Sequence, residues 1–318
     1  MLDLKPIKQA VRQAAEYTQL VRTHAPSRPA LKAGAEPVTL ADYGAQAILG
    51  RALLKSYPDD GVFAEESAAQ FLALVSPDDR AWVATVVSSI LGELVSEADL
   101  VRWLDHGQER TTERMWTVDP VDGTRGFIAG RRYAIAVGVL EGSLPVAGLL
   151  GCPGWPLRQG QGVLFSAQRG AAWAEVLANG KPVRVAVLVP AGLSGVKVVE
   201  SIEEGQGSTG RLSAVLSAAG LSRPSIQQVD GQDKYAMLAA GEAQVYLRFP
   251  NSPDAQYRVW DHAAGVAVVH AAGGAVTDFA GTPLDFSYGR TLAGGRGVLA
   301  TAGGSLHERL LEAVSAQF

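Results

Sequence analysis

Two aspartates separated by two residues are the first sign of chemistry in this sequence. Asp119 and Asp122 lie in residues 116–124, Trp-Thr-Val-Asp-Pro-Val-Asp-Gly-Thr. A turn at the proline, after a strand, would bring the two carboxylates together, and such pairs suit hard cations such as Mg²⁺. Gly123 and Thr124 follow where a helix can begin, so their N–H groups could bind a phosphate oxygen. The same residue types also form ordinary turns, so the run by itself leaves a plain loop open.

Other acidic residues stand beside expected elements. Asp42 comes in the first turn of a helix that Thr39 can cap, where the helix dipole favours a carboxylate. Glu65 and Glu66 follow a short strand and fit solvated charge equally well. Asp261 opens a late helix and has the same dipole explanation as Asp42. For each of these residues taken alone, the ordinary explanation is favoured. Their occurrence in the same chain as the Asp119–Asp122 pair favours a catalytic or metal-binding role.

Hydrophobic spacing predicts the elements that position these residues in the first part of the chain. Apolar residues recur at helical spacing over residues 4–20, whereas residues 25–38 are rich in Pro, Ala and Gly and indicate a loop. A helix is expected from Thr39 to Leu54, where Pro58 closes it off. A short strand is expected at residues 61–64. Residues 69–105 hold two or three helical patterns.

Strand patterns follow from about Met115. A turn is expected at Asp119-Pro120, and Asn179-Gly180 indicates a type I′ hairpin turn. The first half is therefore predicted to be an antiparallel sheet with helices packed on it. The expected strands are 116–118, 133–140, 145–150, 163–166 and 171–177.

Strands and helices alternate after about residue 190, which argues for an α/β layer. We predict an N-terminal α+β domain, residues 1–189, with an antiparallel sheet and most of the metal ligands. A C-terminal α/β domain, residues 190–318, would carry Asp261 and the substrate-binding residues. The expected strands here are 196–199, 226–229, 243–248 and 275–277, and the expected helices are 209–219, 232–240 and 258–272.

Composition excludes several classes of protein. Of 318 residues, 47% are hydrophobic and 19% charged, which is globular rather than disordered. The net charge is −4, without a basic block, so neither a nucleic-acid polymer nor a membrane surface is an expected partner. Cys152 is the only cysteine, which rules out an intrachain disulfide and favours a small apolar filler. No signal-like or membrane-spanning apolar stretch is evident, so a cytoplasmic location is expected.

Two runs resemble the signatures of the inositol-monophosphatase-like superfamily of Mg²⁺-dependent phosphatases. They are Asp-Pro-Val-Asp-Gly-Thr at 119–124, and Trp-Asp-His-Ala-Ala-Gly-Val-Ala with Gly-Gly-Ala-Val-Thr-Asp within 260–278. Val-Thr-Leu-Ala-Asp at 38–42 and Ala-Glu-Glu-Ser at 64–67 precede them in the matching order. The resemblance spans nearly the whole chain and implies the layered αβαβα sandwich of that superfamily.

The resemblance implies a set of metal ligands: Glu65, Asp119, the Val121 carbonyl, Asp122 and Asp261. Asp119 would bridge two Mg²⁺ ions, with Glu65 and the Val121 carbonyl on one ion. Asp122 and Asp261 would hold the other. This arrangement agrees with two-metal catalysis, in which one ion activates the attacking water and the other stabilises the leaving oxygen.

The resemblance also assigns catalytic and phosphate-binding roles. Asp42 and Thr124 would orient and deprotonate the attacking water, with Glu65 in the same catalytic set and Asp42 near a third ion. Gly123 and Thr124 would bind phosphate. Glu66 is expected to support the ligands rather than to be one. The work of such a site is positioning and charge neutralisation, which needs no covalent intermediate.

Finer details resemble the 3′(2′),5′-bisphosphate nucleotidase branch. By this match Lys234 and Arg248 would approach the nucleotide and its second phosphate, whereas the ordinary alternative makes them surface cations. The helical segment at 76–105 resembles an insertion of that branch. The matching runs are 124–128, 150–153, 234–238, 246–250 and 283–287.

Two departures from the branch concern substrate contacts. The branch usually has a His-rich stretch where residues 205–210 read Gly-Gln-Gly-Ser-Thr-Gly, a run that contains Gln206. It also usually has Asp-Ser-Gln where this chain has Asp230-Gly231-Gln232. The loss of a histidine and a serine hydroxyl predicts a weaker preference for the bisphosphate.

The expected function is therefore Mg²⁺-dependent hydrolysis of a phosphate monoester by a monomer or homodimer, with two or three ions in each site. The expected substrate is adenosine 3′,5′-bisphosphate, giving AMP and phosphate, or its 5′-phosphosulfate analogue. Another small ester remains the alternative within this class: an inositol phosphate, histidinol phosphate or a sugar bisphosphate. A non-catalytic metal or nucleotide sensor is disfavoured, because a sensor need not retain Asp42 and Thr124.

Overall fold

The computed structural model describes residues 2–25, 29–32, 37–155, 162–202, 205–221, 224–250, 256–292 and 296–317, without the side chains of 205–209. The first part of the chain is mostly helical. Its elements are α1 (Lys5–His24), β1 (Ala30–Leu31), β2 (Pro37–Val38), α2 (Leu40–Ser56), β3 (Gly61–Ala64), α3 (Ala68–Leu74), α4 (Pro77–Leu91) and α5 (Glu97–Leu104).

The middle of the chain completes a seven-stranded sheet in the order β3-β4-β5-β6-β7-β8-β9. Only the β3–β4 pair is parallel among its described pairs, and the others are antiparallel. The elements are β4 (Arg114–Asp122), α6 (Thr124–Ile128), β5 (Ala134–Glu141), β6 (Leu144–Cys152), β7 (Val163–Gln168), β8 (Ala171–Val176) and β9 (Val183–Val185).

The last part of the chain forms a five-stranded sheet in the order β11-β10-β12-β14-β13. The predicted alternation of strands and helices is confirmed, and β14 and α10 are additions that no sequence pattern had indicated. The elements are β10 (Lys197–Ser201), α7 (Gly205–Ala218), β11 (Ser225–Val229), α8 (Asp233–Ala239), β12 (Val245–Arg248), η2 (Val259–Asp261), α9 (Ala263–Ala271), β13 (Ala275–Thr277), β14 (Val298–Thr301) and α10 (Ser305–Ser315).

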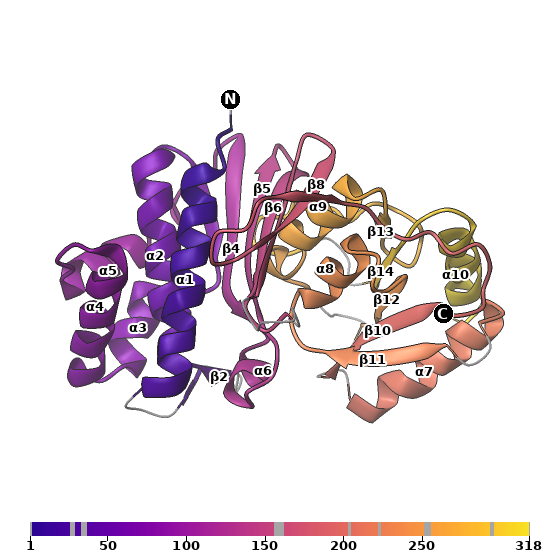
Figure 1. Cartoon of the computed structure of the whole chain (residues 1–318), viewed down its shortest axis with the longest axis horizontal. Coiled ribbons are helices and arrows are strands. Elements are labelled where there is room, and N and C mark those ends of the chain that lie inside the picture. The colour runs from indigo at the N-terminus through magenta and orange to yellow at the C-terminus, as the bar shows by residue number, and fades with distance from the viewer. Residues whose placement is uncertain are drawn as a thin grey trace.

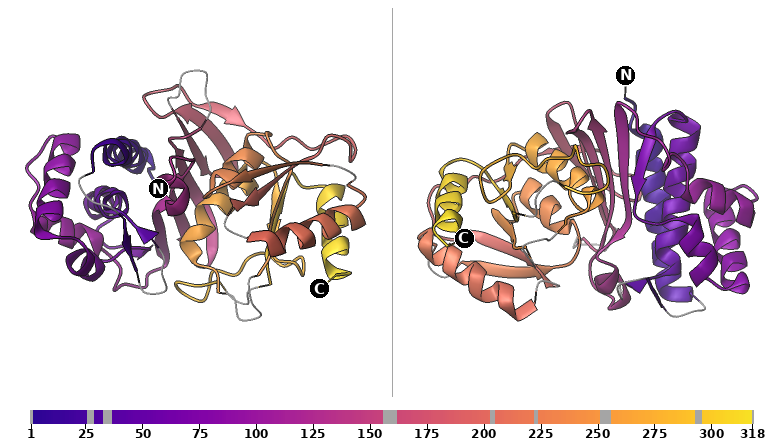
Figure 2. Two further views of the ribbon diagram at one scale, coloured as in Figure 1. Left: turned by 90° about the horizontal axis from the view of Figure 1, so that it is seen from below. Right: turned by 180° about the vertical axis from the view of Figure 1, so that it is seen from behind.

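The elements stack in five layers, as the expected αβαβα sandwich requires (Figure 1). Helices α1 and α2 cover one face of the seven-stranded sheet, α8 and α9 lie between the two sheets, and α7 and α10 cover the far face of the second sheet. Views from below and from behind show the same succession (Figure 2). Three hydrophobic clusters fill the interfaces between the layers. The middle cluster surrounds α8 and α9, reaches both sheets and contains buried Cys152. Burial of these apolar faces is the main force that holds the layers together.

The change of sheet falls between β9 and β10, close to the domain boundary that we predicted at residue 189. However, the middle cluster contains residues of both sheets, including Leu150 of β6 and Val298 of β14. The two parts therefore share a core, and their independence as domains stays a prediction.

The capping of α2 follows directly from local sequence. The Thr39 hydroxyl accepts a hydrogen bond from the Ala41 N–H at 3.0 Å, and Asp42 Oδ2 accepts one from the Thr39 N–H at 2.8 Å. This reciprocal capping box satisfies N–H groups that the first helical turn leaves free. It also fixes the carboxylate of Asp42 at the start of the helix.

The predicted turn at Asp119-Pro120 is wrong, because β4 continues through both residues to Asp122. Asp119 pairs with Ala136 and Asp122 with Ala134, so the register shifts by one extra residue between them. A proline is tolerated at such a bulge because its missing N–H is not needed for pairing. In a flat strand, residues three apart point to opposite faces, and the extra residue returns both aspartates to one side.

The predicted type I′ turn at Asn179-Gly180 is also wrong. Strands β8 and β9 do form an antiparallel pair, but residues 177–182 connect them. Asn179 has φ 132°, whereas Gly180 is not among the glycines with positive φ, and type I′ needs both. A Cβ on Gly180 would lie 2.3 Å from the Val176 nitrogen, so close packing explains this glycine.

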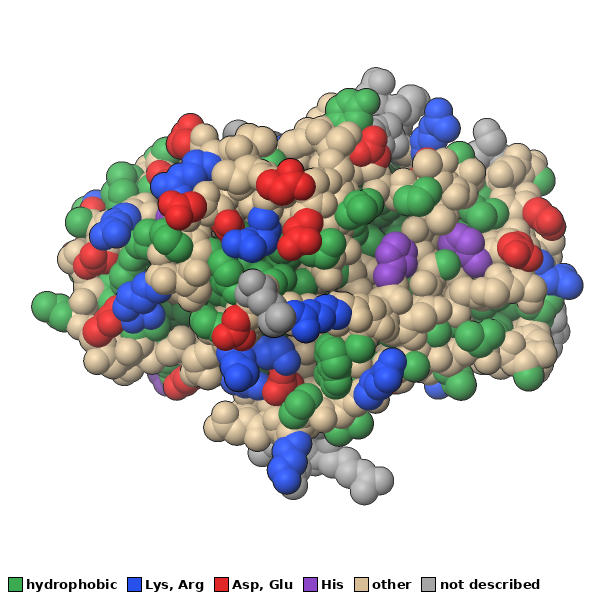
Figure 3. All heavy atoms as spheres, turned by 90° about the horizontal axis from the view of Figure 1, so that it is seen from above, with side chains coloured by type: hydrophobic (Ala, Val, Ile, Leu, Met, Phe, Trp, Pro, Cys, Tyr) green, Lys and Arg blue, Asp and Glu red, His purple; other side chains and the backbone are tan. Residues whose placement is uncertain are grey.

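No helix in the described ranges is long and apolar enough to span a membrane. On the face seen from above, acidic and basic side chains are interspersed among hydrophobic ones (Figure 3). This mixture agrees with the small net charge of −4.

Candidate active site

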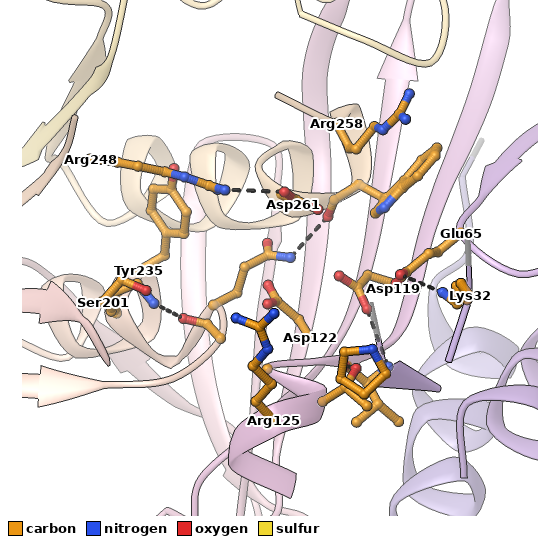
Figure 4. A pocket seen from close by; sticks show the side chains of 18 of the residues that line it. Lys32, Glu65, Asp119, Asp122, Arg125, Ser201, Tyr235, Arg248, Arg258 and Asp261 are labelled. Carbon is orange, nitrogen blue, oxygen red and sulfur yellow. Dashed lines mark hydrogen bonds and ion pairs between the residues drawn. The ribbon is translucent and has the colours of Figure 1, made fainter. Parts of the chain in front are cut away.

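A cavity of about 600 Å³ lies where the ends of β3 and β4 meet the C-terminal part of the chain. Side chains from both parts point into it (Figure 4). It brings together nine of the ten residues that the sequence analysis assigned to the site. They are Glu65, Asp119, Val121, Asp122, Gly123, Thr124, Lys234, Arg248 and Asp261.

The bulge of β4 presents the two aspartates of the first signature. Asp119 is 3% exposed, and burial, followed by repulsion from Glu65, Asp122 and Asp261, raises its pKa well above the ordinary value. Burial likewise raises the pKa of Asp122 to about 6, against the opposing influence of Lys234. Several carboxylates packed this closely are costly as anions, and a cation between them would relieve the cost.

The tenth residue, Asp42, is not among the residues that line the cavity and lies behind them. It is 1% exposed, and burial raises its pKa to about 6. The Thr124 hydroxyl lies 3.3 Å from Asp42 Oδ1 and 3.1 Å from the Val121 carbonyl oxygen and can donate to either. Thr124 thus connects the cavity to Asp42.

Glu65 and Glu66 have different environments. Glu65 lines the cavity, and its N–H donates to the Val118 carbonyl at 3.1 Å, which extends the β3–β4 pairing. Glu66 is fully buried, and its backbone is held by Gln46 through bonds of 2.6 and 2.8 Å. The solvated-charge explanation is therefore wrong for Glu66. Lys32 pairs with both carboxylates, at 2.9 Å from Glu65 Oε1 and also with Glu66 Oε1.

Asp261 stands at the opposite side of the acidic group, at the end of η2. Arg248 Nη1 lies 3.4 Å from its Oδ2 and 3.3 Å from His262 Nε2. Burial raises the pKa of Asp261 to about 7 and lowers that of His262 well below its ordinary value. His262 is therefore neutral, and its Nδ1 is 2.7 Å from the Tyr235 hydroxyl.

Lys234 is 5% exposed, so the surface-cation alternative is wrong for it. Its ammonium donates to the carbonyl oxygens of Val229 at 3.1 Å and Gly231 at 2.7 Å. Gly231 has φ 62°, and a Cβ there would lie 2.3 Å from the Asp122 carbonyl oxygen. A serine side chain would therefore clash with Asp122 in this backbone. The side chain of Gln206, the other departure, lies outside the described residues.

Several lining residues were not anticipated from the sequence. These residues are basic: Lys32, Arg125, Arg258 and Arg290. Isolated basic residues have no characteristic spacing in a sequence, and the segments that hold these four lie far apart in the chain.

The donor set fits a hard divalent cation, because it consists of carboxylates and a backbone carbonyl. Within the described residues, however, no three acidic, His or Cys side chains stand gathered closely enough to hold an ion as they are placed. Glu65 and Asp261 each face a basic side chain instead.

The family model described as "Inositol monophosphatase family" matches residues 3–317. The chain belongs to this family. Family membership implies dependence on Mg²⁺ in general, as expected from the signatures. The extragenic suppressor protein SuhB of Bartonella henselae has the same fold, with a TM-score of 0.68 and 21% identity over 99% of each chain. An IMPase of Thermotoga maritima superposes with a TM-score of 0.66 at 19% identity, over 97% of this chain and 95% of the other.

Curated members of the family include more similar sequences. A 3′(2′),5′-bisphosphate nucleotidase of Emericella nidulans is 34% identical over 96% of this chain and 95% of its own length. A protein of the same name in Schizosaccharomyces pombe is 33% identical over 96% and 93%. A 3′,5′-bisphosphate nucleotidase of Arabidopsis thaliana is 30% identical over 89% and 86%. The expected family resemblance is confirmed.

Proposed function

We propose that this chain is a Mg²⁺-dependent phosphatase that hydrolyses the 3′-phosphate of adenosine 3′,5′-bisphosphate to AMP and phosphate. The observation that carries the proposal is one cavity in which four acidic side chains, Glu65, Asp119, Asp122 and Asp261, adjoin Lys234 and Arg248. The names of the similar nucleotidases support the choice of substrate. The 5′-phosphosulfate analogue would lose its 3′-phosphate in the same way.

The four acidic side chains Glu65, Asp119, Asp122 and Asp261, which we call the acidic wall, would hold two or three ions. Asp119 would be shared, with Glu65 and the Val121 carbonyl on one side and Asp122 and Asp261 on the other. Bound Mg²⁺ would supply charge neutralisation for the transferring phosphoryl group and lower the pKa of attacking water. Glu65 and Asp261 would leave Lys32 and Arg248 to take up these positions.

Thr124 and Asp42 would move the proton of the attacking water. Thr124 Oγ1 accepts that proton while passing its own to Asp42 Oδ1, 3.3 Å away. A pKa of about 6 leaves Asp42 ionised at neutral pH yet basic enough to accept it. The water oxygen then bonds to phosphorus, the bond from phosphorus to the 3′ oxygen breaks, and the 3′ oxygen takes a proton from a solvent water to become the hydroxyl of AMP.

Lys234 and Arg248 would meet the nucleotide or its second phosphate. Gly123 and Thr124 would bind the reacting phosphate at the start of α6. We also propose a cytoplasmic location and a monomeric or homodimeric state.

The test is release of phosphate from a panel of substrates. Adenosine 3′,5′-bisphosphate should be hydrolysed faster than an inositol phosphate, histidinol phosphate or a sugar bisphosphate, and only with added Mg²⁺. Ca²⁺ should replace Mg²⁺ poorly, because its looser coordination misplaces water and phosphate. Full turnover in excess chelator would refute the metal mechanism, and a preference for another ester would replace the substrate.

A further inference from the structure

Two guanidinium groups lie over one indole ring at the wall of the cavity. Arg290 Cζ is 4.8 Å and Arg258 Cζ is 5.8 Å from the ring centroid of Trp260. All three residues line the cavity. In Figure 4, Arg258 lies on the other side of Asp261 from Arg248. The two arginines therefore form a second basic region, separate from that of Lys234 and Arg248.

The backbone fixes the spacing of this pair. Arg258 and Thr291 form an antiparallel bridge, and the Val259 N–H donates to the Arg290 carbonyl at 3.2 Å. Arg290 Nη1 donates to Gln108 Oε1 at 3.2 Å, and its Nη2 donates to the Ala64 carbonyl oxygen. The guanidinium of Arg290 is thus held beside the strand end that carries Glu65.

The positive charge of this pair has no acidic partner in the described part of the chain. The acceptors of Arg290 are an amide and a carbonyl, both neutral. Burial, and then repulsion from Arg258, lowers the pKa of Arg290, which means that the folded protein destabilises the charged form of this side chain. By contrast, Lys32 and Arg248 each face a carboxylate. Uncompensated guanidinium groups in a concave wall are suited to an oxyanion, which they can bind through several N–H donors.

We propose that Arg258 and Arg290 form an anion subsite for a tetrahedral oxyanion, phosphate or sulfate, other than the group being hydrolysed. Only the distinction from the hydrolysed group rests on the proposed function. The indole carries the two guanidinium groups, so it orients them rather than stacking on a base. The anion could be a second group of the substrate or a free ion such as released phosphate.

Calorimetric titration with inorganic sulfate in excess chelator tests the subsite directly. Without metal, the acidic wall repels sulfate, so binding there does not contribute. Arg258→Gln is the main variant, because the Arg258 side chain is exposed and makes no hydrogen bond within the described residues. We expect it to weaken sulfate binding by about tenfold, the usual value of a charge-assisted bond. Arg184→Gln, an exposed arginine of β9 outside the cavity, is the matched control and should bind as wild type does.

Arg290→Lys separates anion binding from a structural role. It keeps the charge but loses the planar fork that reaches Gln108 and Ala64. Loss of these two hydrogen bonds should lower the melting temperature. At a temperature where the variant is still fully folded, we expect sulfate binding to weaken by a few fold. Wild-type sulfate affinity in both variants, or no sulfate binding by the wild type, would overturn the subsite.

Kinetics then identifies the source of the anion. If the substrate supplies it, Arg258→Gln should lower kcat/KM for the bisphosphate by about tenfold and leave a monophosphate unaffected. If a free ion supplies it, both substrates keep their kcat/KM and only inhibition by phosphate weakens. A chain that hydrolyses no phosphate ester yet loses sulfate binding in Arg258→Gln would refute the proposed function and retain the subsite. A chain that hydrolyses the bisphosphate but binds no sulfate would support the proposed function and refute the subsite.

Discussion

The two walls of the cavity are built in different ways. On the N-terminal wall, Glu65, Asp119 and Asp122 stand at the ends of β3 and β4, two neighbouring strands that are hydrogen-bonded in register. On the C-terminal wall, the basic residues come from separate segments: the start of α8, the end of β12, the approach to η2 and the segment before β14.

Under the proposed function, this difference separates the residues that would carry out catalysis from those that would recognise the substrate. Paired strands hold the acidic groups to a fixed spacing, which positioning of metal and water requires. Separate segments allow single basic side chains to be altered without disturbing the sheet. Three residues cross the division. Asp261 joins the acidic group from the C-terminal part. Two basic residues come from the N-terminal part: Lys32, which follows β1 and pairs with Glu65, and Arg125 of α6.

The largest effect is expected on the acidic wall. Asp122→Asn should lower kcat by at least about a hundredfold, since an amide carries no charge for the metal site. The fold should remain, because the amide has nearly the same shape as the carboxylate. Phosphate release and circular dichroism check the two parts of this prediction. Near-wild-type turnover would show that Asp122 is not a ligand.

On the basic wall, Arg248→Ala should weaken use of the bisphosphate selectively. Loss of charge-assisted bonds to a second phosphate predicts a roughly ten- to hundredfold fall in kcat/KM. A monophosphate should be barely affected, and the loss should shrink as salt rises if the contact is open to solvent. The measurement is kcat/KM for both substrates. Equal losses on both would assign Arg248 to supporting Asp261, which it contacts at 3.4 Å.

The acidic wall should also make stability depend on pH. The pKa values of Asp122 and Asp261 in the folded protein are raised to about 6 and about 7, above an ordinary 3.8. The folded state therefore binds protons more tightly than the unfolded state, so this contribution is present below about pH 4 and is lost by about pH 7. In chelator, Asp122→Asn should become more stable than wild type by roughly 2 kcal/mol as pH rises from about 4 to about 7, since each unit of pKa shift corresponds to about 1.4 kcal/mol.

Urea unfolding at several pH values measures this difference. Asp99→Asn is the control, because the carboxylate of Asp99 at the start of α5 has a pKa lowered by hydrogen bonds from Ser96. That variant should instead become less stable than wild type as pH rises, since the wild type gains stability when Asp99 ionises. If the difference in unfolding free energy between wild type and Asp122→Asn does not vary with pH, the raised pKa of Asp122 in the folded protein would be contradicted.

The smallest effect concerns Lys32, which joins the acidic wall by an ion pair. Lys32→Met should raise the affinity for Mg²⁺ by about two- to fivefold, because an ammonium no longer competes for Glu65. Calorimetric Mg²⁺ titration measures it without reference to activity. Arg125→Met removes a cavity charge that pairs with no described carboxylate, so a smaller gain is expected. Equal gains in both variants would mean that general electrostatics, rather than the ion pair, sets the affinity.

Much of the acidic wall could be predicted from the sequence because its signals are local. The Asp119–Thr124 run is contiguous, and Thr39 and Asp42 form a capping box within one helical turn. Apolar spacing likewise predicted α1, whose buried residues recur every three or four positions. Such patterns depend on neighbours a few residues apart, so the sequence by itself determined them.

Only the tertiary structure decided the rest. The bulge that turns Asp119 and Asp122 to one side depends on pairing with β5, which no short run reveals. Burial of Glu66 and Lys234 depends on distant segments that exclude water. The pairing of Arg258 with Arg290 requires a bridge between separate parts of the chain. Charged residues have no periodic signal of their own, so their partners emerge only when packing has placed them.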